Sequence, residues 1–264
     1  MIPHKIHYCW FGNHTMPPSA QQCLESWRKC CPDFEICRWD EHNFDMDAND
    51  YVKQAYEHKK WAFVSDVARF WILYRHGGIY LDTDVELLRS PLPLIERGAF
   101  FGMEKIGKHV DVAPGCGMAA PAKDSLLKEI LTYYDTISFL QNGLPNTTQT
   151  VCDHVTRILQ THGYQCVDRE QQVCGWTIYP SVYLCPKDFV SGEVHTTSST
   201  FAIHHFDGSW FGPQQQYAQR CKSTLRKFLP HRAAGHVAAF LAEWKYCGLK
   251  TAAGRVFSYL HHRK

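Results

Sequence analysis

The stretch from Phe63 to Leu88 decides the fold and reads FVSDVARFWILYRHGGIYLDTDVELL. Apolar side chains recur every three or four positions in its first half and predict a helix over 62–75. Gly77 suits the left-handed backbone that follows a helix, and Gly78 lets the chain reverse. The apolar run Ile79–Leu81 then predicts a short buried strand. A helix, a tight turn and a buried strand in this order are typical of an α/β protein.

Two carboxylates, Asp82 and Asp84, follow this strand with one residue between them. Alternation along a strand puts them on one side, and fraying at the strand end lets both converge on one cation. Carboxylate oxygens suit Mg²⁺ or Mn²⁺ that also binds substrate phosphates. The pattern indicates an enzyme that uses a nucleotide-activated sugar, although an isolated Asp-x-Asp is also common in solvated turns.

The preceding helix carries Asp66 and Arg69 on its mostly apolar face, one turn apart. Charged groups on such a face need a partner or a ligand. An ion pair within the helix and a ligand-binding role are both open on this evidence.

These motifs together resemble glycosyltransferase family 32, which includes bacterial capsular and lipopolysaccharide sugar transferases, yeast mannosyltransferases and, more distantly, the glucosylating clostridial toxins. The resemblance covers about residues 1–212. It rests on Ser65-Asp66-x-x-Arg69 with Gly77–Asp84, and on further similar segments at Ile2–Gly12, Ser26-Trp27, Cys31–Ile36, Tyr179–Ser181, Cys185–Phe189 and Ile203–Trp210.

The resemblance implies the GT-A fold, an α/β fold with a mixed, mainly parallel central sheet flanked by helices. It also implies a site. The implied catalytic residues are Asp66, Arg69, Asp82 and Asp84; the nucleotide-sugar contacts are Trp10, Asp66, Arg69, Tyr80, Asp82, Ser209 and Trp210; the metal ligands are Asp82, Asp84 and His205. The toxins place a carboxylate near the position of His205, so the metal role of this histidine stays open.

The function we expect is a metal-dependent, retaining glycosyltransferase that uses Mn²⁺ or Mg²⁺. It would move a hexose from a UDP-sugar, or a GDP-sugar, to a growing surface glycan or a lipid-linked oligosaccharide. Two alternatives remain. The segment Asp82–Val85 also fits an aspartate-nucleophile phosphatase, although no late acidic pair follows a strand. A non-catalytic sugar-binding module is the other.

Strands and helices are predicted to alternate along the first 213 residues, which we expect to form the catalytic domain. The predicted strands are Lys5–Trp10, Phe34–Trp39, Ile79–Asp82, Phe100–Met103, Gly117–Ala120, Ile178–Pro180 and Phe201–His204. The predicted helices are Ala20–Lys29, Tyr51–Lys59, Ala62–Arg75, Ser125–Tyr134 and Gln149–Gln160. A polar loop is predicted at Asn142–Thr147.

Residues 214–264 form a basic tail with ten Lys and Arg against one acid, Glu243, whereas the whole chain has a net charge of only +2. Apolar residues at helical spacing predict helices that Pro230 and Gly235 interrupt. Such a tail can bind an anionic membrane surface or pack on the catalytic domain. No motif indicates nucleic-acid binding.

Length, composition and cysteine content fit a cytoplasmic protein, peripheral on the inner face of the membrane if the tail binds there. The 264 residues are 45% hydrophobic and 20% charged, which is ordinary for a globular chain. We see no secretory signal and no run of about 20 apolar residues that could span a bilayer. The twelve cysteines show no Cys-x-x-Cys and no zinc-finger spacing, so reduced thiols are expected.

Overall fold

The structure is a computed structural model that describes residues 1–189, 191–208, 213–226, 228–229, 231–249 and 251. The chain divides into two compact units, Met1–Phe206 and Asp207–Lys264. The predicted division into a catalytic domain and a tail after residue 213 stays a prediction.

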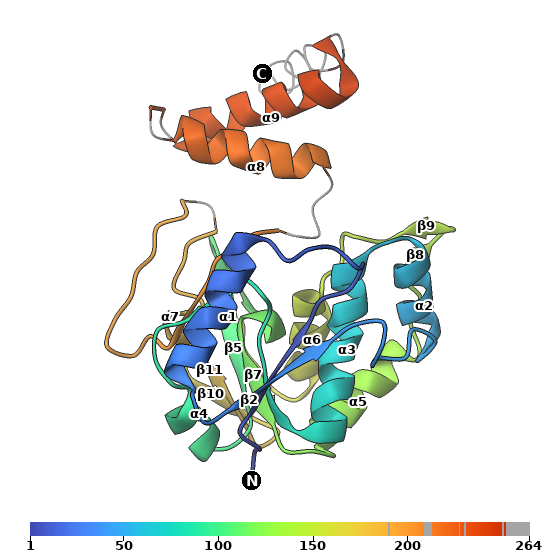
Figure 1. Cartoon of the computed structure of the whole chain (residues 1–264), viewed down its shortest axis with the longest axis vertical. Helices are drawn as coiled ribbons and strands as arrows, with labels where there is room; N and C mark the ends of the chain where they lie inside the picture. The colour runs from blue at the N-terminus through green and yellow to red at the C-terminus, as the bar shows by residue number, and fades with distance from the viewer. Residues whose placement is uncertain (190, 209–212, 227, 230, 250, 252–264) are drawn as a thin grey trace. The chain divides into compact units, whose positions relative to one another are not determined.

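An eight-stranded sheet forms the centre of the first unit (Figure 1). Its order is β10-β11-β5-β7-β3-β1-β2, and β6 pairs with β5. The strands are β1 (Lys5–Cys9), β2 (Glu35–Trp39), β3 (Gly78–Tyr80), β5 (Phe100–Ile106), β6 (His109–Val112), β7 (Met118–Ala120), β10 (Gln171–Val173) and β11 (Trp176–Tyr179).

The sheet is mixed and mainly parallel, as predicted. β1 runs parallel to β2 and β3, and β5 runs parallel to β11. β7 is antiparallel to both β3 and β5, so these two strands share one direction. β6 and β10 also run opposite to their neighbours. The parallel strands β1 and β3 therefore end at the same edge.

Helices cover both faces of this sheet. Side chains alternate along β3, so Tyr80 packs on one face while Ile79 packs on the other. Four helices bury apolar residues on the Tyr80 face: α2 (Asp50–Glu57), α3 (Trp61–His76), α5 (Ser125–Tyr134) and α6 (Val151–Thr161). The other face is covered by α1 (Pro18–Cys30), α4 (Leu92–Glu96) and α7 (Ser181–Leu184).

The turn after α3 has the predicted form. Gly77 has a φ of 63°, and its amide donates to the carbonyl of Leu73 at 2.8 Å. His7 on β1 links this turn to β2: Nε2 lies 3.0 Å from the Gly77 carbonyl, and Nδ1 accepts from Trp39 Nε1 at 3.1 Å. These bonds tie the middle of β1 to the end of β2 and to the turn after α3.

Two short sheets lie outside the central one. β4 (Val85–Leu87) pairs antiparallel with β12 (Ala202–His204), and β8 (Leu140–Gln141) pairs with β9 (Leu144–Pro145). A 3-10 turn, η1 (Pro114–Cys116), precedes β7. The hairpin β8–β9 occupies part of the region predicted as a polar loop.

The second unit contains the helices α8 (Pro213–Leu225) and α9 (His231–Cys247), which pack against each other. The predicted helical tail is confirmed, but Gly235 lies inside α9 instead of interrupting it. A glycine costs about 1 kcal/mol in a helix, which packing can offset. Trp244 is 50% exposed and Tyr246 is 44% exposed. No helix in the described part of the chain has the length and apolar character needed to cross a bilayer.

Candidate active site

The site forms where β3 ends and the chain turns into β4. β3 stops at Tyr80, and the amide of Val85 donates to the carbonyl of Asp82 at 3.0 Å, so the two aspartates lie in a turn. The carbonyl of Gly115, in η1, accepts from the Asp82 amide at 2.9 Å. Because β12 pairs with β4, His204 lies opposite Val85 and next to this turn. Two distant segments, η1 and β12, therefore meet at the turn that carries the two aspartates.

Arg69 links the helix to the first aspartate. Its Nη2 lies 3.1 Å from Asp66 Oδ1 and 3.2 Å from Asp82 Oδ1, and its side chain is only 3% exposed. Its Nε donates to the carbonyl of Ser65 at 3.0 Å. The Tyr80 hydroxyl donates to Asp82 Oδ1 at 3.1 Å. The predicted Asp66–Arg69 ion pair is present, and Asp82 extends it to the end of the strand.

The charges of this network are unequal, since one guanidinium serves two carboxylates. Burial raises the pKa of Asp66 to about 7, although the neighbouring Arg69 opposes the shift. Burial disfavours the charged form of Arg69, but Asp82, Tyr80 and Asp66 outweigh it and raise its pKa. Arg69 therefore stays charged, and Asp66 holds a proton more readily than an ordinary aspartate does.

Asp82, Asp84 and His204 form a cluster that could hold a metal ion. One ligand atom from each lies within 4.8 Å of the others. His204 Nε2 is 3.3 Å from Asp84 Oδ1. Burial disfavours imidazolium at His204, but Asp84 and Cys185 outweigh it and raise the pKa well above its ordinary value. Two carboxylates and an imidazole fit a divalent cation such as Mn²⁺, which would replace the proton on the His204 imidazole.

The histidine in this cluster is His204 and not the predicted His205. Neighbouring residues of β12 and its extension face opposite ways, and the pairing with β4 turns His204 towards the aspartates. The amide of His205 donates to the carbonyl of Asp84 at 2.9 Å, while its Nε2 lies 2.9 Å from Glu86 Oε2. The side chain of His205 is thus engaged by Glu86.

Gly115 lets the backbone of η1 approach the carboxylates closely. A Cβ at this position would lie 2.0 Å from Asp82 Oδ2 and 3.1 Å from Arg69 Nη1. Any side chain here would displace Asp82. Sequence reasoning missed this residue, because no local pattern connects it to a motif more than 30 positions earlier.

A second missed residue is Glu104 on β5. Burial raises its pKa, and its neighbours include His204 and the thiol of Cys152 at the start of α6. Cys185 lies between His204 and Cys116, both of which lower its pKa. An acid among the apolar residues of β5 was the available signal for this buried polar layer behind His204.

The remaining predicted contacts are less defined. Trp10 lies just beyond β1, is partly buried, and donates from Nε1 to the carbonyl of His14 at 2.7 Å. Its predicted role as a base-stacking residue stays a prediction. Ser209 and Trp210 lie outside the described residues. Asp66, Arg69, Tyr80, Asp82 and Asp84 are brought together as expected.

Comparison with known proteins identifies the segment that contains these residues. Residues 17–101 match the family model described as the glycosyltransferase sugar-binding region containing the DXD motif. Over this segment the chain is similar to a glycosyltransferase sugar-binding region, and the resemblance seen in the sequence is confirmed.

Two curated relatives agree with this assignment. Inositol phosphoceramide mannosyltransferase 3 of Schizosaccharomyces pombe is 34% identical over 103 residues, which are 38% of this chain and 29% of that protein. An uncharacterized glycosyltransferase of Acanthamoeba polyphaga mimivirus is 30% identical over 115 residues, 40% of this chain and 45% of that protein. The chain thus spans less than half the length of these relatives.

Solved structures with a similar arrangement include the PaToxG glycosyltransferase, with 16% identity and a TM-score of 0.46 over 61% of this chain and 69% of that one. The galactosyltransferase LgtC, in complex with donor and acceptor sugar analogs, has 11% identity and a TM-score of 0.43 over 89% of this chain and 95% of that one.

Proposed function

We propose that this protein is a glycosyltransferase that moves a hexose from a nucleoside-diphosphate sugar to a glycan acceptor. The observation that carries the proposal is the convergence of Asp82, Asp84 and His204 beside the buried Arg69. Arg69, Asp82 and Asp84 lie in the matched segment, residues 17–101, and His204 joins them from β12.

The two sides of the site have different roles. Asp82, Asp84 and His204 would hold Mn²⁺ or Mg²⁺, which when bound neutralises the charge that develops on a departing diphosphate. Arg69, held by Ser65 and two carboxylates, fixes the orientation of Asp66 and Asp82. Preorganised groups of this kind favour transfer, because they need no rearrangement as charge develops.

Contacts to the donor follow from the surrounding residues. Asp66 and Arg69 would bind hydroxyl groups of the donor sugar and ribose, Tyr80 lies under the nucleotide, and Trp10 stacks on its base. A UDP-sugar is the favoured donor and a GDP-sugar the second candidate. Transfer proceeds with retention, by attack on the same face that the diphosphate leaves.

The acceptor we propose is a growing surface glycan or a lipid-linked oligosaccharide. The name of the fission yeast relative includes a lipid acceptor, inositol phosphoceramide, which supports this class. The second unit would bring the enzyme to the cytoplasmic face of a membrane. Trp244, Lys245 and Tyr246 are exposed on α9, where aromatic and basic side chains could contact anionic headgroups.

Incubation with UDP-, GDP- and CDP-sugars in the presence of Mn²⁺ tests the proposal. Release of nucleoside diphosphate with transfer of the sugar is expected, together with a higher melting temperature, because a ligand of the native state stabilises it. Asp84→Ala should abolish the Mn²⁺ dependence and nearly all transfer. Asp33→Ala, which removes an exposed carboxylate from the turn between α1 and β2, should change neither.

The two alternative functions, phosphatase and sugar-binding module, predict different results in this experiment. Release of inorganic phosphate without sugar transfer would indicate a phosphatase. A thermal shift without turnover would indicate a sugar-binding module. Full transfer by Asp84→Ala would refute the assignment of the site.

A further inference from the structure

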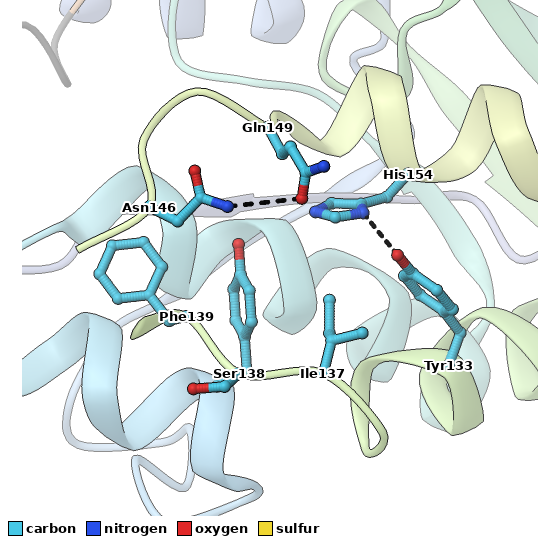
Figure 2. Close-up of a pocket in the computed structure, with 8 residues that line it drawn as sticks. Tyr133, Ile137, Ser138, Phe139, Asn146, Gln149 and His154 are labelled. Atoms are coloured by element: carbon cyan, nitrogen blue, oxygen red, sulfur yellow. Dashed lines mark hydrogen bonds between the residues drawn. The ribbon is translucent and has the colours of Figure 1, made fainter. Parts of the chain in front are cut away.

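A pocket in the first unit lies outside the carboxylate cluster, among α2, α5, α6 and the β8–β9 hairpin (Figure 2). Water-sized spheres can occupy about 50 Å³ of it. That volume holds a few water molecules or the hydroxyl-bearing edge of a small ring. Its lining residues are Tyr51, Tyr133, Ile137, Ser138, Phe139, Asn146, Gln149 and His154.

The lining carries no formal charge at neutral pH. None of the eight residues is Asp, Glu, Lys or Arg. Burial lowers the pKa of His154, the one residue that could become a cation, and the nearby Arg157 adds to this effect. A phosphate, a carboxylate or an ammonium group would meet no charged side chain in the lining and would lose its hydration. The pocket therefore selects an uncharged ligand.

Hydrogen-bonding groups nevertheless face the pocket. His154 is 4% exposed, and its Nδ1 lies 2.8 Å from the Tyr133 hydroxyl. Figure 2 shows the other ring nitrogen turned towards the side where Asn146 and Gln149 lie. Tyr51 is 3% exposed, and no hydrogen bond engages its hydroxyl within the described part of the chain. A neutral imidazole, amides and a phenol offer both donors and acceptors, which suits hydroxyl groups.

Aromatic rings supply the apolar part of the lining. The rings of Tyr51 and Phe139 lie 5.5 Å apart at 74°. Tyr133 contributes a third ring at the side of His154. Phe139 is fully buried and Tyr51 is 3% exposed, so these rings close the base of the pocket and the polar groups of the lining are left to contact a ligand. Neutral donors and acceptors above an aromatic base suit a carbohydrate.

The helices α2 and α5 of the pocket pack against α3, which carries Asp66 and Arg69 of the transfer site. Burial raises the pKa of Tyr51, and the next contribution comes from Asp66 on α3, so the two side chains are close. A sugar bound here would lie in the helix layer that packs against α3.

We propose that this pocket binds one uncharged sugar unit of the acceptor glycan. The identification of the ligand as part of the acceptor rests on the proposed glycosyltransferase function. The binding itself does not require transfer. It defines the substrate class: an acceptor with a neutral hexose or N-acetylhexosamine at or next to its growing end.

Saturation-transfer NMR on the full chain, without nucleotide or metal, tests the binding. The probes are the methyl glycosides of glucose, galactose, mannose and N-acetylglucosamine, with methyl glucuronide as a charged comparator. At least one neutral glycoside should bind, and the glucuronide should not. Binding of none of the neutral probes, or equal binding of the glucuronide, would overturn the proposal.

Two variants locate the site. Tyr51→Phe removes only a hydroxyl, and Gln149→Ala removes an exposed amide, so the second reports even if the first unfolds the protein. Each should weaken glycoside binding about five- to tenfold, the effect of one lost hydrogen bond. Tyr164→Phe is the matched control, because it removes another buried hydroxyl that lacks a hydrogen bond. Unchanged binding in both pocket variants would reject this location.

Failure of this proposal is distinguishable from failure of the proposed function. Glycoside binding without transfer from any nucleotide sugar would leave the pocket assigned and remove the transferase. Sugar transfer, together with glycoside binding that neither Tyr51→Phe nor Gln149→Ala changes, would support the transferase and reject the pocket assignment.

Discussion

Gly115→Ala should damage the site far more than it damages the fold. The new Cβ would lie 2.0 Å from Asp82 Oδ2, whereas real Cβ atoms essentially never approach another atom within 3.0 Å. Either Asp82 or η1 must therefore move by about 1 Å. The other oxygen, Oδ1, is held by Arg69 at 3.2 Å and by Tyr80 at 3.1 Å, so movement of Asp82 also strains these contacts.

The magnitudes follow from this displacement. A misplacement of about 1 Å in a reacting site can cost about 10²-fold in rate. Overpacking costs about 1–3 kcal/mol of stability. At 2–4 °C per kcal/mol, we expect the melting temperature to fall by roughly 2–12 °C. The protein should stay folded at 25 °C and lose most of its transfer activity and its metal-dependent nucleotide affinity.

Three measurements decide the outcome: kcat/KM with the best nucleotide sugar, calorimetric binding of the nucleoside diphosphate with Mn²⁺, and thermal unfolding. Gly235→Ala is the control, because a Cβ there meets nothing within 4 Å. In α9 this change should raise stability slightly and leave activity unchanged. Activity and nucleotide affinity of Gly115→Ala within twofold of the original protein would refute the reasoning.

Three other predictions can be checked independently. Burial lowers the pKa of His7 to about 4, below its unfolded value of 6.5, so between these pH values the imidazole takes up a proton only in the unfolded state. The free energy of unfolding should therefore fall by up to about 3 kcal/mol as the pH drops from 6.5 to 4. Urea titrations of His7→Gln should lack this pH dependence. The raised pKa of Asp66 acts in the opposite direction in both proteins, so the difference between the two pH profiles is the test, and identical profiles would contradict the assignment. Trp10→Ala should weaken donor binding by roughly 1–3 kcal/mol, the range for base–aromatic stacking, whereas a large loss of stability with unchanged donor affinity would show a purely structural tryptophan. Removal of residues 214–264 should abolish sedimentation with anionic vesicles at low salt, and equal sedimentation of both proteins would leave the tail without a membrane role.

The sequence predicts the central motif well because its signals are local. Helical periodicity up to Arg75, the glycine pair and the apolar run before Asp82 each constrain their own backbone. They give α3, the turn and β3 nearly as observed. The convergence of Asp82 and Asp84 follows from the end of this strand.

The missed parts of the site depend on register and on distant segments. A shift of one residue in the short strand β12 exchanges the faces of His204 and His205, and only its pairing with Val85 and Leu87 on β4 decides between them. Gly115 becomes important only when η1 packs over Asp82. Such contacts have no signature in a single sequence.

The strand order has a consequence for protein engineering. The matched segment, residues 17–101, contributes β2 and β3 to the sheet, but β1 lies between these two strands and comes from outside the segment. β7, on the other side of β3, also comes from outside, as does His204. The matched segment is therefore not a self-contained structural unit. Grafted into another protein, or expressed alone, it would expose both edges of β3 and would need a host that supplies two strands in register.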